Sequence, residues 1–162
     1  METKLITEKN EILYAYAAEW DFAADGSPLE LVKEMTRIMF EHRGIGLAAP
    51  QIGVSKRIFI MGNKELLIAC INPSYFSVAP KTLDLEGCLS FPNLWLRIYR
   101  HENIMAKYQD VEGKAIETDF EGIQARVFQH EYSHLEGRVF TQEVSRLALD
   151  LARKKQRKAN NK

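Results

Sequence analysis

The chain has 162 residues, of which 46% are hydrophobic and 27% are charged, as in an ordinary globular protein. This length fits one domain with a substantial hydrophobic core. The formal net charge is zero, which excludes a global field that would attract DNA or a membrane surface. No apolar run approaches the length of a membrane-spanning helix.

The expected compartment is the cytoplasm. Residues 1–4 lack the charged-then-apolar layout of a signal peptide. The two cysteines are too few for a disulfide framework, and Cys70 lies in an apolar run that predicts a buried small side chain. A reducing compartment would keep the other cysteine, Cys88, available as a thiolate.

The first half of the chain predicts an extended arm, one helix and a loop. Residues 1–26 are weakly patterned, with a turn near residues 14–19. A helix is predicted over residues 27–42, because a serine N-cap and a proline at the first position open it. Its apolar face comprises Leu31, Met35, Ile38 and Met39. Residues 44–53 are rich in small side chains, typical either of a packing turn or of a backbone that a ligand approaches closely.

The middle of the chain predicts strands. Apolar and β-branched runs bounded by turn residues occur at residues 57–61, 66–71, 94–100, 103–108 and 114–119. Asn72 and Pro73 are predicted to end the second run, and residues 74–85 predict at most one edge strand. Strands between flanking helices indicate an α+β fold.

A second helix is predicted over residues 121–137, and it carries a His-Glu-x-x-His motif. His130 and His134 lie four residues apart, so their rings share one helix face and could bind one metal ion. Glu131 could then act as general base toward a water. The motif also occurs in helices by chance, as an exposed or hydrogen-bonded pair.

A catalytic metal site needs a third protein ligand. One class of zinc peptidase places a third histidine after the glycine that follows the motif, but Phe140 occupies that position here. Another class uses a glutamate from a later helix, and Glu143 follows too soon. The remaining candidate lies upstream, where Cys88 follows Glu86 and Gly87 in a polar segment.

A last helix is predicted over residues 142–158, with Val144, Leu147, Ala148 and Leu151 on its apolar face. Its end is strongly basic. It is typical of a solvated, fraying tail, or of a segment that binds weakly to an anionic surface.

Three segments, taken together and in their order along the chain, resemble the peptide deformylase family. They read Gly-Ile-Gly-Leu-Ala-Ala-Pro-Gln at residues 44–51, Glu-Gly-Cys-Leu-Ser at 86–90, and Gln-His-Glu-Tyr-Ser-His-Leu-Glu-Gly at 129–137. The resemblance spans about residues 11–140. It implies one catalytic domain over residues 1–162, with a basic C-terminal helix from about 142. It further implies antiparallel β-sheets wrapped around a central metal-binding helix, with an N-terminal and a C-terminal helix.

The resemblance implies a metal-dependent hydrolase that removes the formyl group from the N-terminal formyl-methionine of new polypeptides and releases formate. Cys88, His130 and His134 would hold one divalent metal ion, and the family uses Fe(II), Zn(II) or Ni(II). Glu131 would be the general base, while the Gln51 amide and the Leu89 backbone N–H would stabilise the oxyanion. The implied substrate contacts are Ile45, Gly46, Ile123 and Val127. Ribosomal RNA is an implied partner of the basic helix.

Two positions depart from the family pattern. Ser133 replaces an aspartate, which in the family pairs with an arginine that matches Arg100. We therefore expect the groups that support the metal ligands to hold them less firmly in this chain. Arg126 stands where the family's helix is apolar, and it either points to solvent or alters what the site accepts after methionine. Two other functions remain: a zinc peptidase, and an impaired family member that only binds.

Overall fold

The computed structural model describes residues 3–162, so Met1 and Glu2 of the N-terminal segment considered above lie outside it. The α-helices are α1 (Leu29–Glu41), α2 (Gly122–Leu135) and α3 (Arg146–Asn160). The strands are β1 (Gly46–Ala48), β2 (Ile58–Gly62), β3 (Leu67–Phe76), β4 (Lys81–Cys88), β5 (Phe91–His101), β6 (Asn103–Gln109) and β7 (Ala115–Glu121). Short 3₁₀ helices span Glu11–Tyr14, Ala49–Ile52 and Phe140–Glu143.

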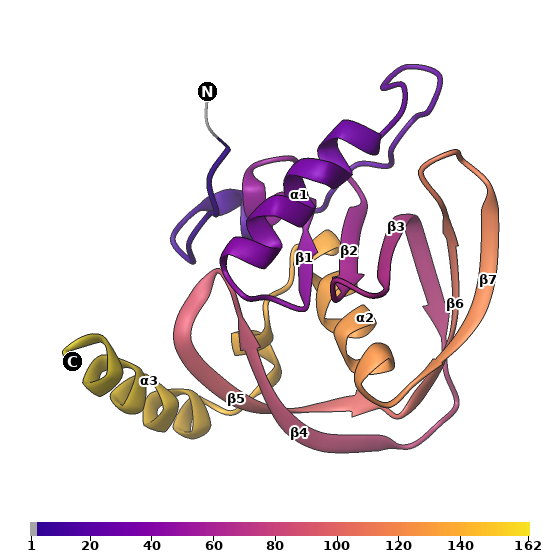
Figure 1. Cartoon of the computed structure of the whole chain (residues 1–162). Helices are drawn as coiled ribbons and strands as arrows, with labels where there is room; N and C mark the ends of the chain where they lie inside the picture. The colour runs from indigo at the N-terminus through magenta and orange to yellow at the C-terminus, as the bar shows by residue number, and fades with distance from the viewer. Residues whose placement is uncertain (1–2) are drawn as a thin grey trace.

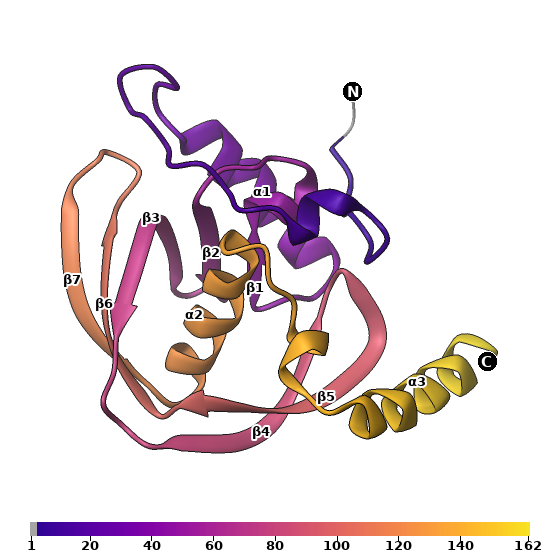
Figure 2. The same ribbon diagram turned by 180° about the vertical axis from the view of Figure 1, so that it is seen from behind.

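Two antiparallel sheets surround α2. One sheet has five strands in the order β1-β2-β3-β6-β7, and the second is the hairpin of β4 and β5. Figures 1 and 2 show α2 in the middle, with the large sheet curving past it and the hairpin crossing beneath it. Helix α1 covers the β1–β2 end, whereas α3 extends outward beyond β5. The predicted arrangement of sheets around a central helix is confirmed.

The packing of α2 explains its central place. Phe128 is fully buried, and its ring meets Phe59 of β2 edge-on at 4.9 Å between centroids. Tyr75 of β3 and Phe120 of β7 contact the same ring at 5.9 and 5.8 Å. Because aromatic side chains bury large areas, this cluster anchors the helix to three strands of the large sheet. Any residue on the opposite face of α2 is thereby held toward the β4–β5 hairpin.

One strand prediction is wrong in extent. The second strand does not end at Asn72 and Pro73, because β3 continues to Phe76 through a register shift between Ile71 and Ser74. Asn72 adopts a φ of 50°, and its side chain bonds the Trp20 backbone, so the irregularity is held in place. The edge strand expected within residues 74–85 is present as β4, which extends to Cys88 and pairs with β5 along most of its length.

The helix boundaries also shift. Helix α1 begins at Leu29 with Pro28 at the N-cap, so the expected start at residue 27 is early. The last helix does not begin at 142: residues Phe140–Glu143 form a 3₁₀ turn, and Ser145 caps α3 by accepting from the Ala148 N–H. The predicted apolar face is wrong for Leu147 and Leu151, which are 69% and 52% exposed.

The face of α3 that packs on the domain comprises Leu149, Ala152 and Gln156. Gln156 donates to the Pro92 carbonyl at the start of β5. The helix therefore lies on the hairpin through a mixed surface. Cys70 is fully buried, as predicted. No helix within residues 3–162 has the length and apolar character to cross a membrane.

Candidate metal centre

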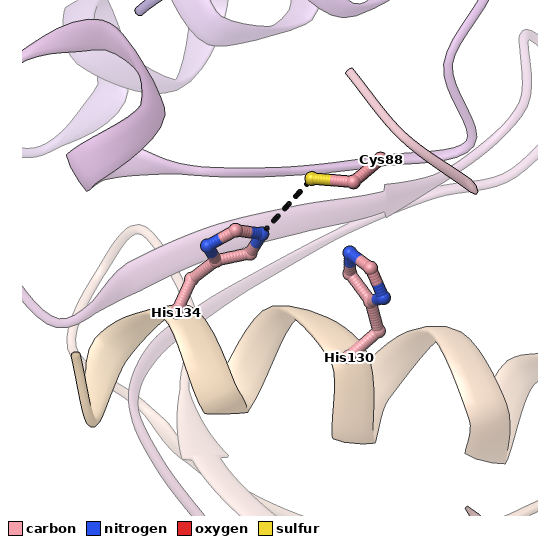
Figure 3. Close-up of side chains that lie close together, drawn as sticks. All are labelled: Cys88, His130 and His134. Atoms are coloured by element: carbon pink, nitrogen blue, oxygen red, sulfur yellow. Dashed lines mark hydrogen bonds between the residues drawn. The ribbon is translucent and has the colours of Figure 1, made fainter. Parts of the chain in front are cut away.

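Three side chains from distant segments converge between α2 and the β4–β5 hairpin. Cys88 lies at the end of β4, and His130 and His134 project from successive turns of α2 (Figure 3). One ligand atom from each lies within 4.8 Å of the others, and Cys88 Sγ is 3.4 Å from His134 Nε2. The structure thus brings together the three residues predicted as metal ligands.

The hairpin turn sets the position of the thiol. The register of β4 and β5 shifts between Gly87 and Cys88, so the cysteine leaves the regular pairing. A Cβ at Gly87 would lie 2.7 Å from the Trp95 ring, so the glycine makes room for the indole on the neighbouring strand.

The donor set fits a divalent metal. His130 Nδ1 lies 2.7 Å from Glu86 Oε1, which leaves Nε2 of that ring for a metal. His134 directs Nε2 toward the thiol, and among the described residues its buried Nδ1 has no hydrogen-bond partner. Metal–sulfur and metal–nitrogen bonds at tetrahedral angles separate the donor atoms by about 3.3–3.6 Å, close to the sulfur–nitrogen distance found here.

The charges around the rings favour a cation. Burial alone lowers the pKa of His130, but the neighbouring Cys88 and Glu86 outweigh it and raise the pKa to about 10. Burial and the positive His130 lower the pKa of His134 well below its usual value. The pKa values of the two rings therefore shift in opposite directions, and the negative groups that raise the pKa of His130 would equally favour a bound cation.

Glu131 follows His130 on α2 and is almost fully buried. Its Oε2 has no hydrogen-bond partner in the described part of the chain, and burial raises the pKa of the carboxyl to about 7. A Cβ at Gly46 would lie 2.9 Å from the Glu131 carboxyl carbon and 2.9 Å from Val127 Cγ1. The absence of a side chain at Gly46 therefore makes room for this carboxylate.

Gln51 is oriented by its own loop. The residue is buried, and its Oε1 accepts from the Ala48 N–H at 2.9 Å. This contact turns Nε2 toward the hairpin, where it lies 3.5 Å from Cys88 Sγ and donates to Ser90 Oγ at 3.1 Å. The amide therefore presents an N–H at the edge of the metal centre.

The other predicted site residues do not all lie in one place around the three metal ligands. Leu89 follows Cys88 in the hairpin turn, and its side chain packs against the core beneath α1. Val127 lies next to Gly46 and Glu131, whereas Ile45 and Ile123 are 53% and 62% exposed. Ile123 borders a cleft of about 590 Å³ whose other lining residues are Thr82, Asp84, His101, Glu102, Asn103, Glu121, Gly122 and Arg126. Ile45 and Val127 do not line this cleft.

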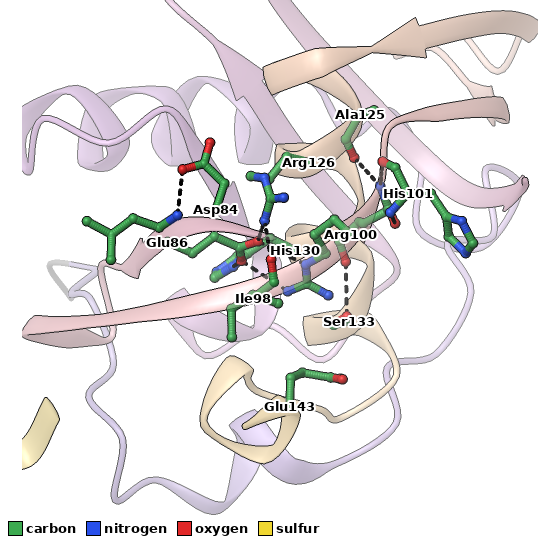
Figure 4. A network of polar contacts seen from close by, with 12 residues as sticks. Asp84, Glu86, Ile98, Arg100, His101, Ala125, Arg126, His130, Ser133 and Glu143 are labelled. Carbon is green, nitrogen blue, oxygen red and sulfur yellow. Dashed lines mark hydrogen bonds and ion pairs between the residues drawn. The ribbon is translucent and has the colours of Figure 1, made fainter. Parts of the chain in front are cut away.

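The sequence did not reveal the polar network behind the histidines (Figure 4). Arg100 binds Glu86, not residue 133, and Ser133 Oγ donates to the Gln129 carbonyl one turn back. Arg126 is 6% exposed and also binds Glu86, so it does not point to solvent. Two sequence signals pointed to this network: Arg126, on a helix face that the family keeps apolar, and Arg100, which in the family pattern pairs with the residue at position 133.

The contacts of Glu86 control its ionisation. Burial by itself raises the pKa of this carboxyl, but the hydrogen bonds with His130 and Arg100 are stronger in sum and lower the pKa to about 2. Glu86 is therefore a buried carboxylate over the whole ordinary pH range. It can hold His130 in the tautomer that leaves Nε2 unprotonated.

Comparison with known proteins identifies relatives of the same kind. "Peptide deformylase" of Thermotoga sp. (strain RQ2) is 40% identical over 99 residues, which cover 60% of this chain and 60% of that protein. The corresponding protein of Thermotoga maritima is 42% identical over 92 residues, or 56% of each chain. The aligned segment thus spans less than two thirds of the length of these curated relatives.

Solved structures extend the likeness over more of the chain. A peptide deformylase from Legionella pneumophila superposes with a TM-score of 0.89 at 33% identity, covering 99% of this chain and 96% of that one. The enzyme from Thermotoga maritima superposes with a TM-score of 0.84 at 34% identity, covering 90% and 99%. The sequence model described as "Polypeptide deformylase" matches residues 3–149. With most of its residues inside that match, the chain belongs to the polypeptide deformylase family.

Proposed function

We propose that this protein is a metal-dependent hydrolase that removes the formyl group from the N-terminal formyl-methionine of newly made polypeptides. The observation that carries the proposal is the convergence of Cys88, His130 and His134 within 4.8 Å. The next residue after His130 is the buried Glu131, whose Oε2 has no hydrogen-bond partner among the described residues. Membership of the polypeptide deformylase family supports the same reaction.

Cys88 Sγ and the Nε2 atoms of His130 and His134 would hold one divalent ion. A thiolate with two imidazoles suits Fe(II) or Zn(II), and Ni(II) fits as well. When bound, the ion would act as a Lewis acid that polarises the formyl carbonyl group, and it would lower the pKa of a water molecule toward neutrality.

Glu131 is the proposed general base. Its unpartnered Oε2 can take a proton from the attacking water as the water oxygen bonds to the formyl carbon. The same carboxyl then gives the proton to the amine nitrogen as the carbon–nitrogen bond breaks, so formate and a free N-terminal methionine leave. A buried position favours both steps, because it keeps the carboxyl poised between its two protonation states.

Gln51 and Leu89 are the proposed oxyanion donors. Negative charge develops on the formyl oxygen when the water adds, and an N–H aimed at that oxygen stabilises it by about 3 kcal/mol. Gln51 is suited to this role because the Ala48 N–H already holds its amide in one orientation. Leu89 would contribute its backbone N–H from the turn that follows the cysteine.

The methionine of the substrate would lie between the strand after Ile45 and the exposed face of α2. Gly46 and Val127 border Glu131 directly, which supports their role as the inner contacts. Ile45 and Ile123 are both more than half exposed, and we propose that they contact the substrate from its outer side. Apolar side chains exposed next to a catalytic carboxylate provide the surface that a thioether side chain requires.

Formate release from formyl-methionyl peptides tests the proposal. Anaerobically purified protein should release formate and contain one divalent metal ion per chain, while unformylated peptides and casein should remain intact. Glu131→Gln should keep the metal and lose about 10²–10⁴-fold in turnover. A Glu131→Gln variant with full activity would refute the base assignment. Hydrolysis of casein would favour a peptidase, and bound metal without formate release would indicate a protein that only binds.

We further propose that residues 1–162 act as one catalytic domain in the cytoplasm and that α3 contacts ribosomal RNA. Lys154, Lys155, Arg157 and Lys158 are all exposed on α3, while Gln156 holds the helix to the domain. Replacing Lys154, Lys155 and Lys158 by glutamate should weaken cosedimentation with ribosomes and leave turnover of short peptides unchanged. Unaltered cosedimentation would contradict this partner.

A further inference from the structure

We propose that Arg126 is a positioning residue of the metal centre: its guanidinium holds Glu86 and, through Glu86, the ring of His130. The inference deepens the proposed function and rests on its metal site. Arg126 lies one turn before His130 on α2 and is 6% exposed. In Figure 4 its guanidinium points from the helix toward the β4–β5 hairpin.

The Glu86 carboxylate is the point where these contacts meet. Its Oε1 lies 2.7 Å from His130 Nδ1 and accepts from Arg100 Nη2 at 3.1 Å. Its Oε2 accepts from Arg100 Nε at 3.0 Å and from Arg126 Nη1 at 2.7 Å. Arg126 thus makes the shortest of the arginine contacts, and charge-assisted bonds of this length are the strong ones.

Arg126 also connects the helix to both strands of the hairpin. Its Nη1 donates to the Ile98 carbonyl of β5 at 2.8 Å, and its Nη2 donates to the Thr82 carbonyl of β4 at 2.8 Å. Since α2 carries the histidines and β4 ends at Cys88, one guanidinium controls the spacing of the helix from the strand that supplies the thiol. Water cannot replace these bonds easily because the group is buried.

Other roles for Arg126 predict different behaviour. If it only stabilised the fold, its loss would lower the melting temperature and leave metal affinity unchanged in the folded protein. If it served as a substrate contact at the cleft beside Ile123, its loss would change KM for peptides. The metal affinity of the protein without substrate would then stay unchanged. A positioning residue instead changes how tightly the centre holds a metal before any substrate is present.

The test is Co(II) binding to the metal-free protein, followed by visible absorption and by competition with a chelator. Arg126→Met removes the guanidinium and keeps an unbranched stem. We expect its Co(II) dissociation constant to rise about 10–100-fold, with an altered absorption spectrum. Arg126→Lys retains a charge that can reach Glu86 and loses part of the strand contacts, so its dissociation constant should fall between those of wild type and Arg126→Met.

Arg57→Met is the matched control. Arg57 is 4% exposed, and its guanidinium binds the Leu135 carbonyl and the Glu136 carboxylate at the other end of α2. We expect this variant to melt at a lower temperature and to bind Co(II) within about threefold of wild type. An Arg126→Met variant with wild-type affinity and spectrum would overturn the inference, as would an equal loss of affinity in Arg57→Met.

If Arg126→Met does not fold, Arg126→Lys and Arg126→Gln provide the comparison. The inference requires the lysine variant to bind Co(II) more tightly than the glutamine variant, and equal affinities would overturn it. Failure of the wild-type protein to bind Co(II) would refute the metal site of the proposed function instead. Weakened binding in Arg126→Met alone, with formate release by wild type, supports both proposals.

Discussion

Gly46 should be required for activity because it leaves room for the general base. In Gly46→Ala the new Cβ would lie 2.9 Å from the Glu131 carboxyl carbon and 2.9 Å from Val127 Cγ1, whereas ordinary contacts begin at 3.4 Å. The nearest Glu131 oxygen is closer still, so the carboxylate must retreat by roughly 1 Å. A displacement of this size costs about 100-fold in rate, which corresponds to about 2.7 kcal/mol in the activation barrier.

The assay is formate release, with metal content measured on the same samples. Gly46→Ala should remain folded and keep its metal, because the larger movement falls on the end of the flexible Glu131 side chain and Val127 must shift by only about 0.5 Å. None of the three ligands is touched. The matched control is Gly26→Ala, where a Cβ meets no atom within 4 Å but the φ of 76° is unfavourable. That variant should lose roughly 1 kcal/mol of stability and retain full turnover. Gly46→Ala with turnover within threefold of wild type would refute the reasoning.

Further predictions concern stability. Phe128→Ala should lower the free energy of unfolding by about 3–5 kcal/mol in urea denaturation, because the ring is fully buried against three aromatic neighbours. The pKa of Glu86 lies at about 2 against an ordinary 4.5, so the stability that it contributes above pH 4.5 should disappear as pH falls toward 2. That loss amounts to roughly 3 kcal/mol, and in acid titration Glu86→Gln should show a shallower decline. Removing metal by chelation should lower the melting temperature, Zn(II) should restore it, and Cys88→Ala should abolish this response; an unchanged melting temperature after chelation would contradict the proposed centre.

Local patterns in the sequence predicted much of the fold. The i, i+4 spacing of His130 and His134 predicted a shared helix face. The helix predicted over residues 121–137 ends at Leu135, just before Gly137, whose φ is 70°. The apolar periodicity of residues 27–42 indicated the core face of α1, where Met35, Ile38 and Met39 are buried. Such features depend on neighbours within one or two turns, and the sequence contains those directly.

The tertiary structure decided which distant groups meet. Periodicity predicted that Leu147 and Leu151 would be buried, but α3 packs on the domain through Leu149, Ala152 and Gln156, and Gln156 donates to the Pro92 carbonyl of β5. Nothing within a turn of Arg126 indicates that its guanidinium reaches Thr82 and Glu86 on another element.

The sequence alone therefore determined the metal-binding residue types, the helix that carries two of them, and the family pattern. The distances among Cys88, His130 and His134, and the arginine–carboxylate network that orients His130, depend on how the hairpin crosses α2. The physical reason is that helix spacing and capping arise from local backbone geometry. Contacts between residues far apart in the chain exist only after the aromatic core has fixed α2 between the two sheets.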